Sequence, residues 1–171
     1  MKSLTRSRQP RTTEAVKDAG GVTEYLGFKV ASITGAFPVS IVREIARTAP
    51  ITPVPRAPNG VLGITSFRGR VVTVIDLGQR MGLASSTIGR SPAMFAGNAR
   101  TNRIRVLMVD VGQETIGFVV DEVLLVYRFG AKEIERATHT LGTDVGAHVV
   151  GIARPSPTEV VLLLEAKALL P

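Results

Sequence analysis

One stretch, residues 60–77, constrains the fold more than any other part of the chain. Two runs within it, Val61 to Phe67 and Arg70 to Ile75, are rich in β-branched residues, which favour extended backbone. The step Arg68-Gly69 between them supplies a glycine, which tolerates the positive φ angle that a tight hairpin turn requires. The sequence therefore predicts a β-hairpin with an arginine at its tip.

The rest of the chain repeats this pattern of short strands and turns. Its 17 glycines and 10 prolines separate runs that are rich in valine, isoleucine and threonine, as is typical of all-β proteins. Hydrophobic residues make up 44% of the 171 residues, which is enough to bury the core of one or two small domains. Further strands are predicted over residues 25–30, 103–109, 115–120, 123–127, 145–153 and 159–164.

Two short helices are predicted among these strands. The first lies near residues 40–47, where a serine can cap the start and Ile41 and Ile45 stand one helical turn apart. In such a helix Val42 and Glu44 would project towards solvent. The second covers residues 165–170, whose two leucines would pack back on the body of the protein.

Charge and composition divide the chain into segments. Residues 1–105 hold 16 Lys and Arg against 5 Asp and Glu, whereas residues 106–171 hold 5 against 9. Residues 1–21 are basic and poor in large apolar side chains, which predicts a disordered tail. Residues 84–102 show neither a strand nor a helix period for long, which predicts a mobile basic loop. The two β-rich halves are then residues 22–83, with the terminal helix packing back on them, and residues 103–164.

The sequence gives no reason to propose an enzyme. It has no cysteine, and its two histidines, His139 and His148, lack the spacing of a metal site. It also lacks the glycine-rich phosphate loop of nucleotide-binding proteins and the nucleophile motif of serine hydrolases. We therefore predict no catalytic residues, no metal and no cofactor. No apolar run approaches the 18 or so residues of a membrane span, so a cytoplasmic location is expected.

Several segments, taken in order, resemble one family. The strongest is Gly63-Ile-Thr-Ser-Phe-Arg-Gly69 followed by Val74-Ile-Asp-Leu77, and a third element, Gly117-Phe-Val-Val-Asp-Glu-Val123, comes later in the chain. Weaker matches are Tyr25-Leu-Gly-Phe28, Ile41-Val-Arg-Glu-Ile45 and the loop that contains Pro53 and Pro58. With these segments, residues 24–170 resemble the chemotaxis coupling proteins, the CheW-like domain.

The resemblance implies a fold and a function. The fold would be two SH3-like five-stranded β-barrels side by side, the first over residues 22–83 and the second over residues 103–164, which together form one CheW-like domain over residues 22–170. The function would be that of a non-catalytic adaptor between the cytoplasmic tips of chemoreceptors and the regulatory domain of a CheA-type histidine kinase. The protein would meet the membrane only indirectly, through those receptors.

Site residues follow from the matching positions. The resemblance implies a receptor-binding surface formed by Val42, Glu44, Gly63, Arg68 and Gly69. It also implies that Val123 and Val126 line the second barrel's share of a partner groove.

The sequence departs from the family in three places. Ser66-Phe67 stands where the family usually has Asn-Leu, Pro38 occupies the second strand, and the link over residues 84–102 is longer and more basic than usual. The long link suggests a specialised pathway, such as pilus motility.

Two other readings stay open. The net charge of +7 is compatible with a nucleic-acid-binding β-barrel, although the eight aromatic residues do not interleave with a basic run, and no nucleic acid is expected as a partner. The second alternative is a CheW-like module that binds a different protein partner.

Overall fold

The computed structural model describes residues 21–47, 50–83, 103–137 and 143–171. The predicted basic tail, apart from Gly21, and the predicted loop over residues 84–102 lie outside these ranges. Within them the chain forms eleven strands and only short helical segments, so the prediction of an all-β protein is confirmed.

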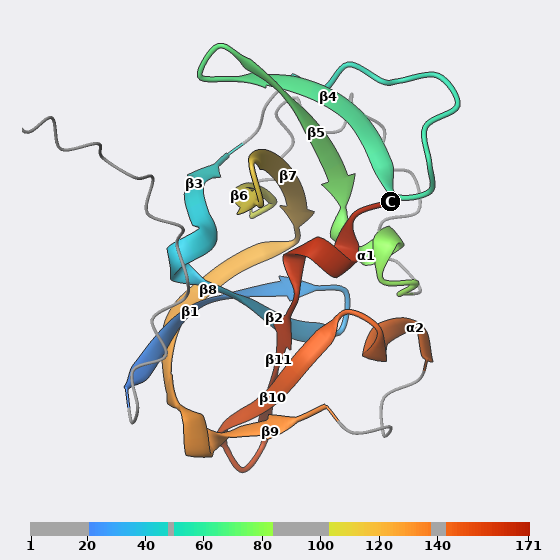
Figure 1. Ribbon diagram of the computed structural model, residues 1–171. Coiled ribbons are helices and arrows are strands. Elements are labelled where there is room, and N and C mark those ends of the chain that lie inside the picture. Colours follow the sequence, from blue (N-terminus) through green and yellow to red (C-terminus); the bar gives the residue numbers. More distant parts are fainter. Residues whose placement is uncertain (1–20, 48–49, 84–102, 138–142) are drawn as a thin grey trace, which may run out of the picture.

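The strands form two sheets, seen one above the other in Figure 1. The first sheet has the order β8 (Glu122–Gly130), β1 (Val22–Val30), β2 (Ile33–Pro38), β11 (Glu159–Leu164), β10 (Val149–Ser156) and β9 (Ile134–Arg136). The second sheet has the order β3 (Val42–Ala46), β6 (Arg105–Val111), β7 (Glu114–Val120), β5 (Arg70–Asp76) and β4 (Val61–Phe67). The short helical segments are η1 (Val39–Ile41), α1 (Leu77–Arg80), η4 (Ala131–Glu133), α2 (Thr143–Gly146) and η5 (Ala166–Leu169).

Both sheets curl on themselves. In the first, β8 and β9 lie at opposite edges although only the three residues of η4 separate them in the chain, so the edges must approach each other (Figure 1). In the second, Arg68 at the tip of β4 and β5 contacts Glu44 on β3, the strand at the opposite edge. Curling hides the unpaired strand edges that a flat sheet would expose.

The two sheets repeat one arrangement. Without β9, the first sheet is antiparallel throughout except for the pair β2 and β11, and the second is antiparallel except for β7 and β5, at the same place in the order. The second sheet uses β3 to β7 consecutively. The first starts with β8 and takes β1 and β2 from the opposite end of the chain, so it is a circular permutation of the second.

This pairing corrects the expected division of the chain into barrels over residues 22–83 and 103–164. Strands β1 and β2 pair with β8 and β11, while β3 and β5 pair with β6 and β7, so each sheet combines strands from both halves. The local residue pattern that identifies a strand carries no information on which distant strand it joins, and that is why the division was wrong.

A shared core joins the sheets. Phe28 and Phe37 come from the first sheet and Phe118 from the second, and all three are fully buried. Their rings pack in sequence, with centroids 5.1 Å apart for Phe28 and Phe37 and 5.4 Å apart for Phe37 and Phe118. Two smaller clusters fill the other face of each sheet. The protein is therefore one folding body with its largest core between the sheets.

The helix predicted near residues 40–47 is absent. A single turn of 3-10 helix, η1, ends at Ile41, and Val42 to Ala46 form the edge strand β3. Half-buried and exposed residues alternate along β3, which is the period of a strand and not of a helix. Pairing with β6 decides the outcome, since Ile45 lies opposite Leu107.

The C-terminal helix forms as the short 3-10 helix η5. Leu169 is fully buried, and the guanidinium of Arg80 on α1 donates hydrogen bonds to the carbonyl oxygens of Leu169, at 2.9 Å, and of Leu170. These bonds hold the chain end against the second sheet. The strand predicted from residue 145 begins only at Val149, after α2.

Candidate functional site

The hairpin of β4 and β5 presents Arg68 as the sequence predicts. Arg68 and Gly69 both have positive φ angles, 48° and 76°, and Phe67 pairs with Arg70 across the turn. Two central residues at positive φ are the signature of a type I′ turn, whose twist matches that of the strands. The guanidinium carbon of Arg68 lies 5.3 Å from the centre of the Phe67 ring, which is a cation–π contact.

Glu44 meets Arg68 at this tip. Nη2 of Arg68 lies 2.9 Å from Oε2 of Glu44, and the two side chains are 74% and 41% exposed. Ion pairs in such an exposed setting contribute only about 0–1 kcal/mol to stability. The structure therefore brings together two residues of the predicted receptor surface. Their ion pair contributes little free energy, so breaking it costs little.

Val42 is a less accessible member of that predicted set. It begins β3, is half-buried, and packs against the core between the sheets. Its backbone pairs with Val109 of β6, and the register shifts between Val42 and Glu44. Val42 therefore lies two residues before Glu44 on β3, with its side chain packed against the core.

Gly63 lies inside the protein, away from the hairpin tip. Its φ is +149°, and a β-carbon on it would stand 2.1 Å from the carbonyl oxygen of Thr52. Thr52 approaches so closely because it pairs with Ile64 through two backbone hydrogen bonds of 2.8 and 2.9 Å. The close backbone approach that this glycine permits is thus made by the chain itself. Gly69, in contrast, has open space around it.

The two valines predicted to line a groove in the second half lie in different surroundings on β8. Val123 is half-buried and packs against the core between the sheets, whereas Val126 is 46% exposed. The exposed neighbour of Val126 is Leu125, at 58%. An irregularity in the pairing of β8 with β1 breaks the strict alternation between Val123 and Val126, which the sequence does not reveal.

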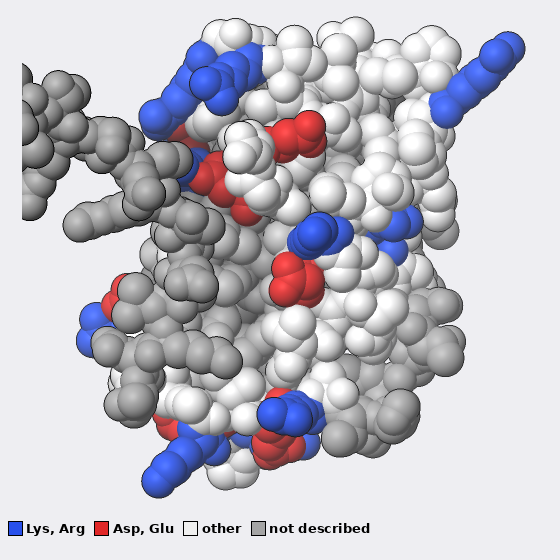
Figure 2. Space-filling model, viewed as in Figure 1, with Lys and Arg blue, Asp and Glu red and all other residues white. Residues whose placement is uncertain are grey.

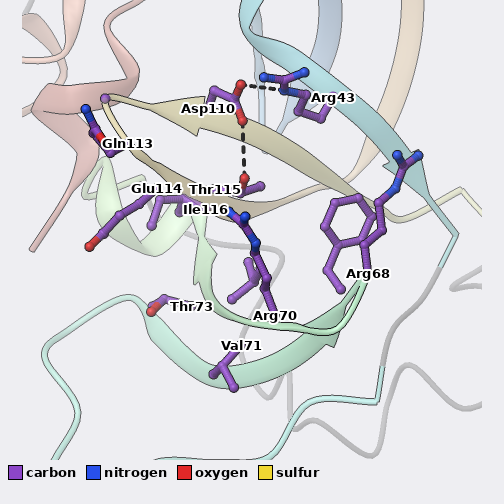
Figure 3. A pocket seen from close by; sticks show the side chains of 13 residues that line it. Arg43, Arg68, Arg70, Val71, Thr73, Asp110, Gln113, Glu114, Thr115 and Ile116 are labelled. Carbon is purple, nitrogen blue, oxygen red and sulfur yellow. Dashed lines mark hydrogen bonds and ion pairs between the residues drawn. The ribbon is translucent and has the colours of Figure 1, made fainter.

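A groove of about 570 Å³ lies beside the hairpin tip, and sequence reasoning missed it. We call it the hairpin groove, since it lies between the hairpin of β4 and β5 and the hairpin of β6 and β7 (Figure 3). It is lined by Arg43, Phe67, Arg68, Arg70, Val71, Val72, Thr73, Asp110, Gly112, Gln113, Glu114, Thr115 and Ile116.

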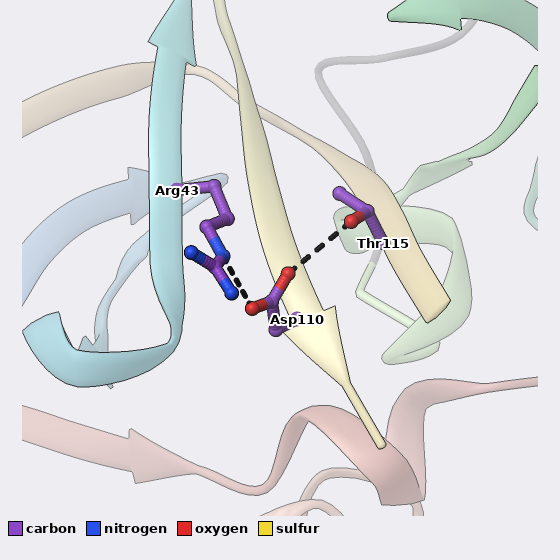
Figure 4. Close-up of polar contacts among 3 residues, drawn as sticks. All are labelled: Arg43, Asp110 and Thr115. Atoms are coloured by element: carbon purple, nitrogen blue, oxygen red, sulfur yellow. Dashed lines mark hydrogen bonds and ion pairs between the residues drawn. The ribbon is translucent and has the colours of Figure 1, made fainter. Parts of the chain in front are cut away.

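A polar chain crosses one wall of this groove. The guanidinium of Arg43 on β3 pairs with Asp110 on β6, and the hydroxyl of Thr115 on β7 donates to the other oxygen of Asp110 at 3.2 Å (Figure 4). The contacts of Asp110 with Arg43 and Thr115 depend on the pairing of three strands. They could not be predicted from the sequence, which indicates a helix where residues 42–46 form β3. Together these residues fix the rim of the groove on the side of β3.

Charges on the described surface are mostly balanced. The described ranges hold 14 Lys and Arg against 12 Asp and Glu, and basic and acidic side chains lie mostly next to each other on the face in Figure 2. Among the described residues, no group of three or more His, Asp and Glu could hold a metal ion. No helix in the same ranges is both long and apolar enough to cross a membrane.

Comparisons with known proteins agree on one family. A family model of the CheW-like domain matches residues 24–171. Protein FrzA of Myxococcus xanthus is 30% identical over 134 residues, which cover 78% of this chain and 75% of FrzA. Chemotaxis protein CheW of Rhizobium meliloti is 27% identical over 124 residues, 72% of each chain.

The fold is also similar to a solved structure. The scaffolding protein TtCheW from Thermoanaerobacter tengcongensis superposes with a TM-score of 0.70 at 23% identity, over 86% of this chain and 91% of TtCheW. The family match runs through both sheets, including β1 at one end of the chain and η5 at the other. The chain therefore belongs to the CheW-like family of chemotaxis coupling proteins.

Proposed function

We propose that this protein is a non-catalytic adaptor that couples chemoreceptors to a CheA-type histidine kinase. The observation that carries the proposal is the family match over residues 24–171, which spans both sheets and the core between them. The similarity to FrzA, beside several proteins named CheW, supports a place in chemotaxis or in a related chemosensory pathway such as pilus motility. Such an adaptor works in the cytoplasm, at receptor arrays on the inner face of the membrane.

The receptor surface in this proposal centres on Glu44 and Arg68. Because their ion pair is exposed, a receptor's helical hairpin can offer either residue a new partner at little cost. A charge-assisted hydrogen bond to Arg68 that the complex buries is worth about 1.5–3 kcal/mol. Val42 borders this surface, and Gly69 leaves the tip without an obstructing side chain.

Gly63 supports the surface indirectly in this proposal. By admitting the carbonyl of Thr52 beside β4, it fixes the strand that leads to the hairpin tip. On the first sheet, Val126 with the neighbouring exposed Leu125 provides a further apolar contact for a partner, and Val123 holds β8 to the core behind them.

The experiment is a binding assay with a receptor cytoplasmic fragment and with the regulatory domain of the kinase. Arg68→Ala should weaken receptor binding about tenfold or more, as the loss of one charge-assisted hydrogen bond predicts. Arg154→Ala is the matched control, because it removes an arginine from another exposed pair, with Glu135, on the first sheet. Unchanged binding of both partners by Arg68→Ala would remove the proposed role of this residue.

The same assay separates the other readings. DNA and RNA titrated at physiological salt should not bind with submicromolar affinity, because the described residues hold 14 Lys and Arg against 12 Asp and Glu and so carry little net positive charge. Tight nucleic-acid binding without receptor or kinase association would replace the proposal with a nucleic-acid-binding module. Failure of all these ligands would point to a CheW-like module with another protein partner.

A further inference from the structure

The hairpin groove has a counterpart in the first sheet. A second groove of about 580 Å³ lies beside the starts of β2 and β11, as the hairpin groove lies beside the starts of β7 and β5. These are the two parallel strand pairs, one in each sheet, and they occupy the same place in the shared strand order. Each groove therefore opens where a parallel pair begins, between two hairpin turns.

The strands around the hairpin groove are not paired along their whole length. The ladder between β5 and β7 runs only from Thr73 opposite Ile116 to Asp76 opposite Val119. Ahead of it, residues 70–72 pair with β4 alone and residues 114–115 pair with β6 alone. Backbone groups on the groove side of both segments thus lack a strand partner. An extended peptide can satisfy such groups by adding a strand to an open sheet edge.

The side chains on the β5 side of the groove favour an acidic occupant. Arg43 is paired with Asp110 and Arg68 with Glu44, whereas Arg70 on β5 makes no hydrogen bond or ion pair with any described residue. Glu114, at the start of β7 on the other side of the groove, also makes none with a described residue, so a carboxylate is favoured beside β5 and disfavoured beside β7. Arg70 lies on the face of β5 that carries the buried Val72, at the point where this face reaches the groove. Figure 3 shows its side chain directed into the space between the two hairpins.

Apolar side chains flank this free cation. Val71, the neighbour of Arg70, is 74% exposed, which is unusual for a valine within a strand, and the ring of Phe67 lies at the tip. An extended segment directs successive side chains to opposite faces. One residue of such a segment can reach Arg70 while its neighbours cover Val71.

We propose that the hairpin groove binds an extended, acidic peptide segment of a protein partner, with a carboxylate on Arg70 and backbone hydrogen bonds to the β5 segment of residues 70–72. This goes beyond the proposed adaptor function, because it assigns a binding mode that does not use the Glu44 contact. The counterpart groove has a lysine, Lys29, in place of arginines, and its Glu159 already accepts a hydrogen bond from Tyr127. We therefore do not expect the acidic peptide to bind in the counterpart groove, which serves as the control site.

The test is an amide NMR titration of the full chain with a blocked pentapeptide, acetyl-Thr-Val-Glu-Val-Thr-amide. Saturable shifts should appear at the amides of residues 70–73 and 114–116. Replacing the peptide's Glu with Gln should weaken binding at least fivefold. Arg70→Gln should weaken binding of the Glu peptide to the level of the Gln peptide, and Arg70→Lys should restore part of it.

The matched control is Lys29→Gln, which removes a cation from the counterpart groove and should leave the peptide's affinity unchanged. Unaltered shifts of buried core amides show that each variant is folded. The proposal is overturned by the absence of saturable shifts, by shifts confined to other residues, or by equal affinity of Arg70→Gln and the unmodified protein for the Glu peptide.

Discussion

At the scale of single residues, Gly63 and Gly69 are two glycines of one hairpin that are required for different structural reasons. Both have positive φ, but only Gly63 has backbone packed against the space where a β-carbon would stand. We expect Gly63→Ala to lower the free energy of unfolding by about 2–4 kcal/mol, because the segment of Thr52 must move away from Ile64. Urea denaturation measures the loss.

Gly69→Ala is the control for that prediction. It places alanine at a φ of +76° with nothing within 4 Å, so only the backbone cost of about 1–2 kcal/mol applies. Equal losses in the two variants would show that the contact with Thr52 does not distinguish Gly63. Should Gly63→Ala instead keep its stability and lose receptor binding, the glycine would belong to the binding surface itself.

At the scale of elements, turns were predictable from the sequence and the edge strand was not. The Arg68-Gly69 turn depends on backbone angles that the two residues themselves determine. Ile41, at the end of η1, and Ile45, on β3, stand at helical spacing beside β-branched residues, so this short segment fits either period. Pairing with β6 stabilises the strand over the helix. The same pairing positions Arg43 and Glu44 for their ion pairs, which could not be predicted from the sequence.

A second element-scale contact joins strands that are not neighbours. Tyr127 on β8 donates a hydrogen bond to Glu159 on β11, although β1 and β2 lie between these strands in the sheet. Burial, then the hydrogen bond to Glu159 and its negative charge, raise the pKa of Tyr127 to about 12 from the ordinary value of 10.0. Between these two values the folded state binds more protons than the unfolded state. The stabilisation that Tyr127 provides is therefore complete below pH 10 and is lost as the pH rises towards 12.

This titration can be observed by phenolate absorbance, since Tyr25 and Tyr127 are the two tyrosines of the chain. Burial also raises the pKa of Tyr25, so both tyrosines should ionise at a higher pH in the native protein than in the unfolded chain. Tyr127→Phe should remove the transition near pH 12 and leave the other. The urea-unfolded protein, in which both should ionise near pH 10, is the control. Ionisation of Tyr127 at pH 10 in the folded protein would contradict the contact with Glu159.

At the scale of the whole molecule, the permuted sheets explain which part of the fold the sequence could yield. Strand positions and the all-β class follow from composition and alternation, and the family resemblance supplies the paired barrels. The pairing partners of each strand cannot be predicted in this way. Strand β2 pairs with β11, more than a hundred residues away, and β5 pairs with β7 on the other side of the long link. The hairpin groove was hidden for the same reason, since the starts of β5 and β7 border it.

The same permutation predicts that the two halves of the chain cannot fold separately. A fragment of residues 1–83 contains β1 and β2 without β8 and β11, and a fragment of residues 84–171 contains β6 and β7 without β3 and β5. Each fragment also lacks part of the core, in which Phe37 packs between Phe28 and Phe118. We expect neither fragment alone to unfold cooperatively in urea, and an equimolar mixture to recover the β-sheet circular dichroism and the single transition of the full chain. A cooperative transition in either isolated fragment would contradict this prediction. It would mean that half of the chain can form a stable folded unit, although each sheet combines strands from both halves and the two sheets share one core.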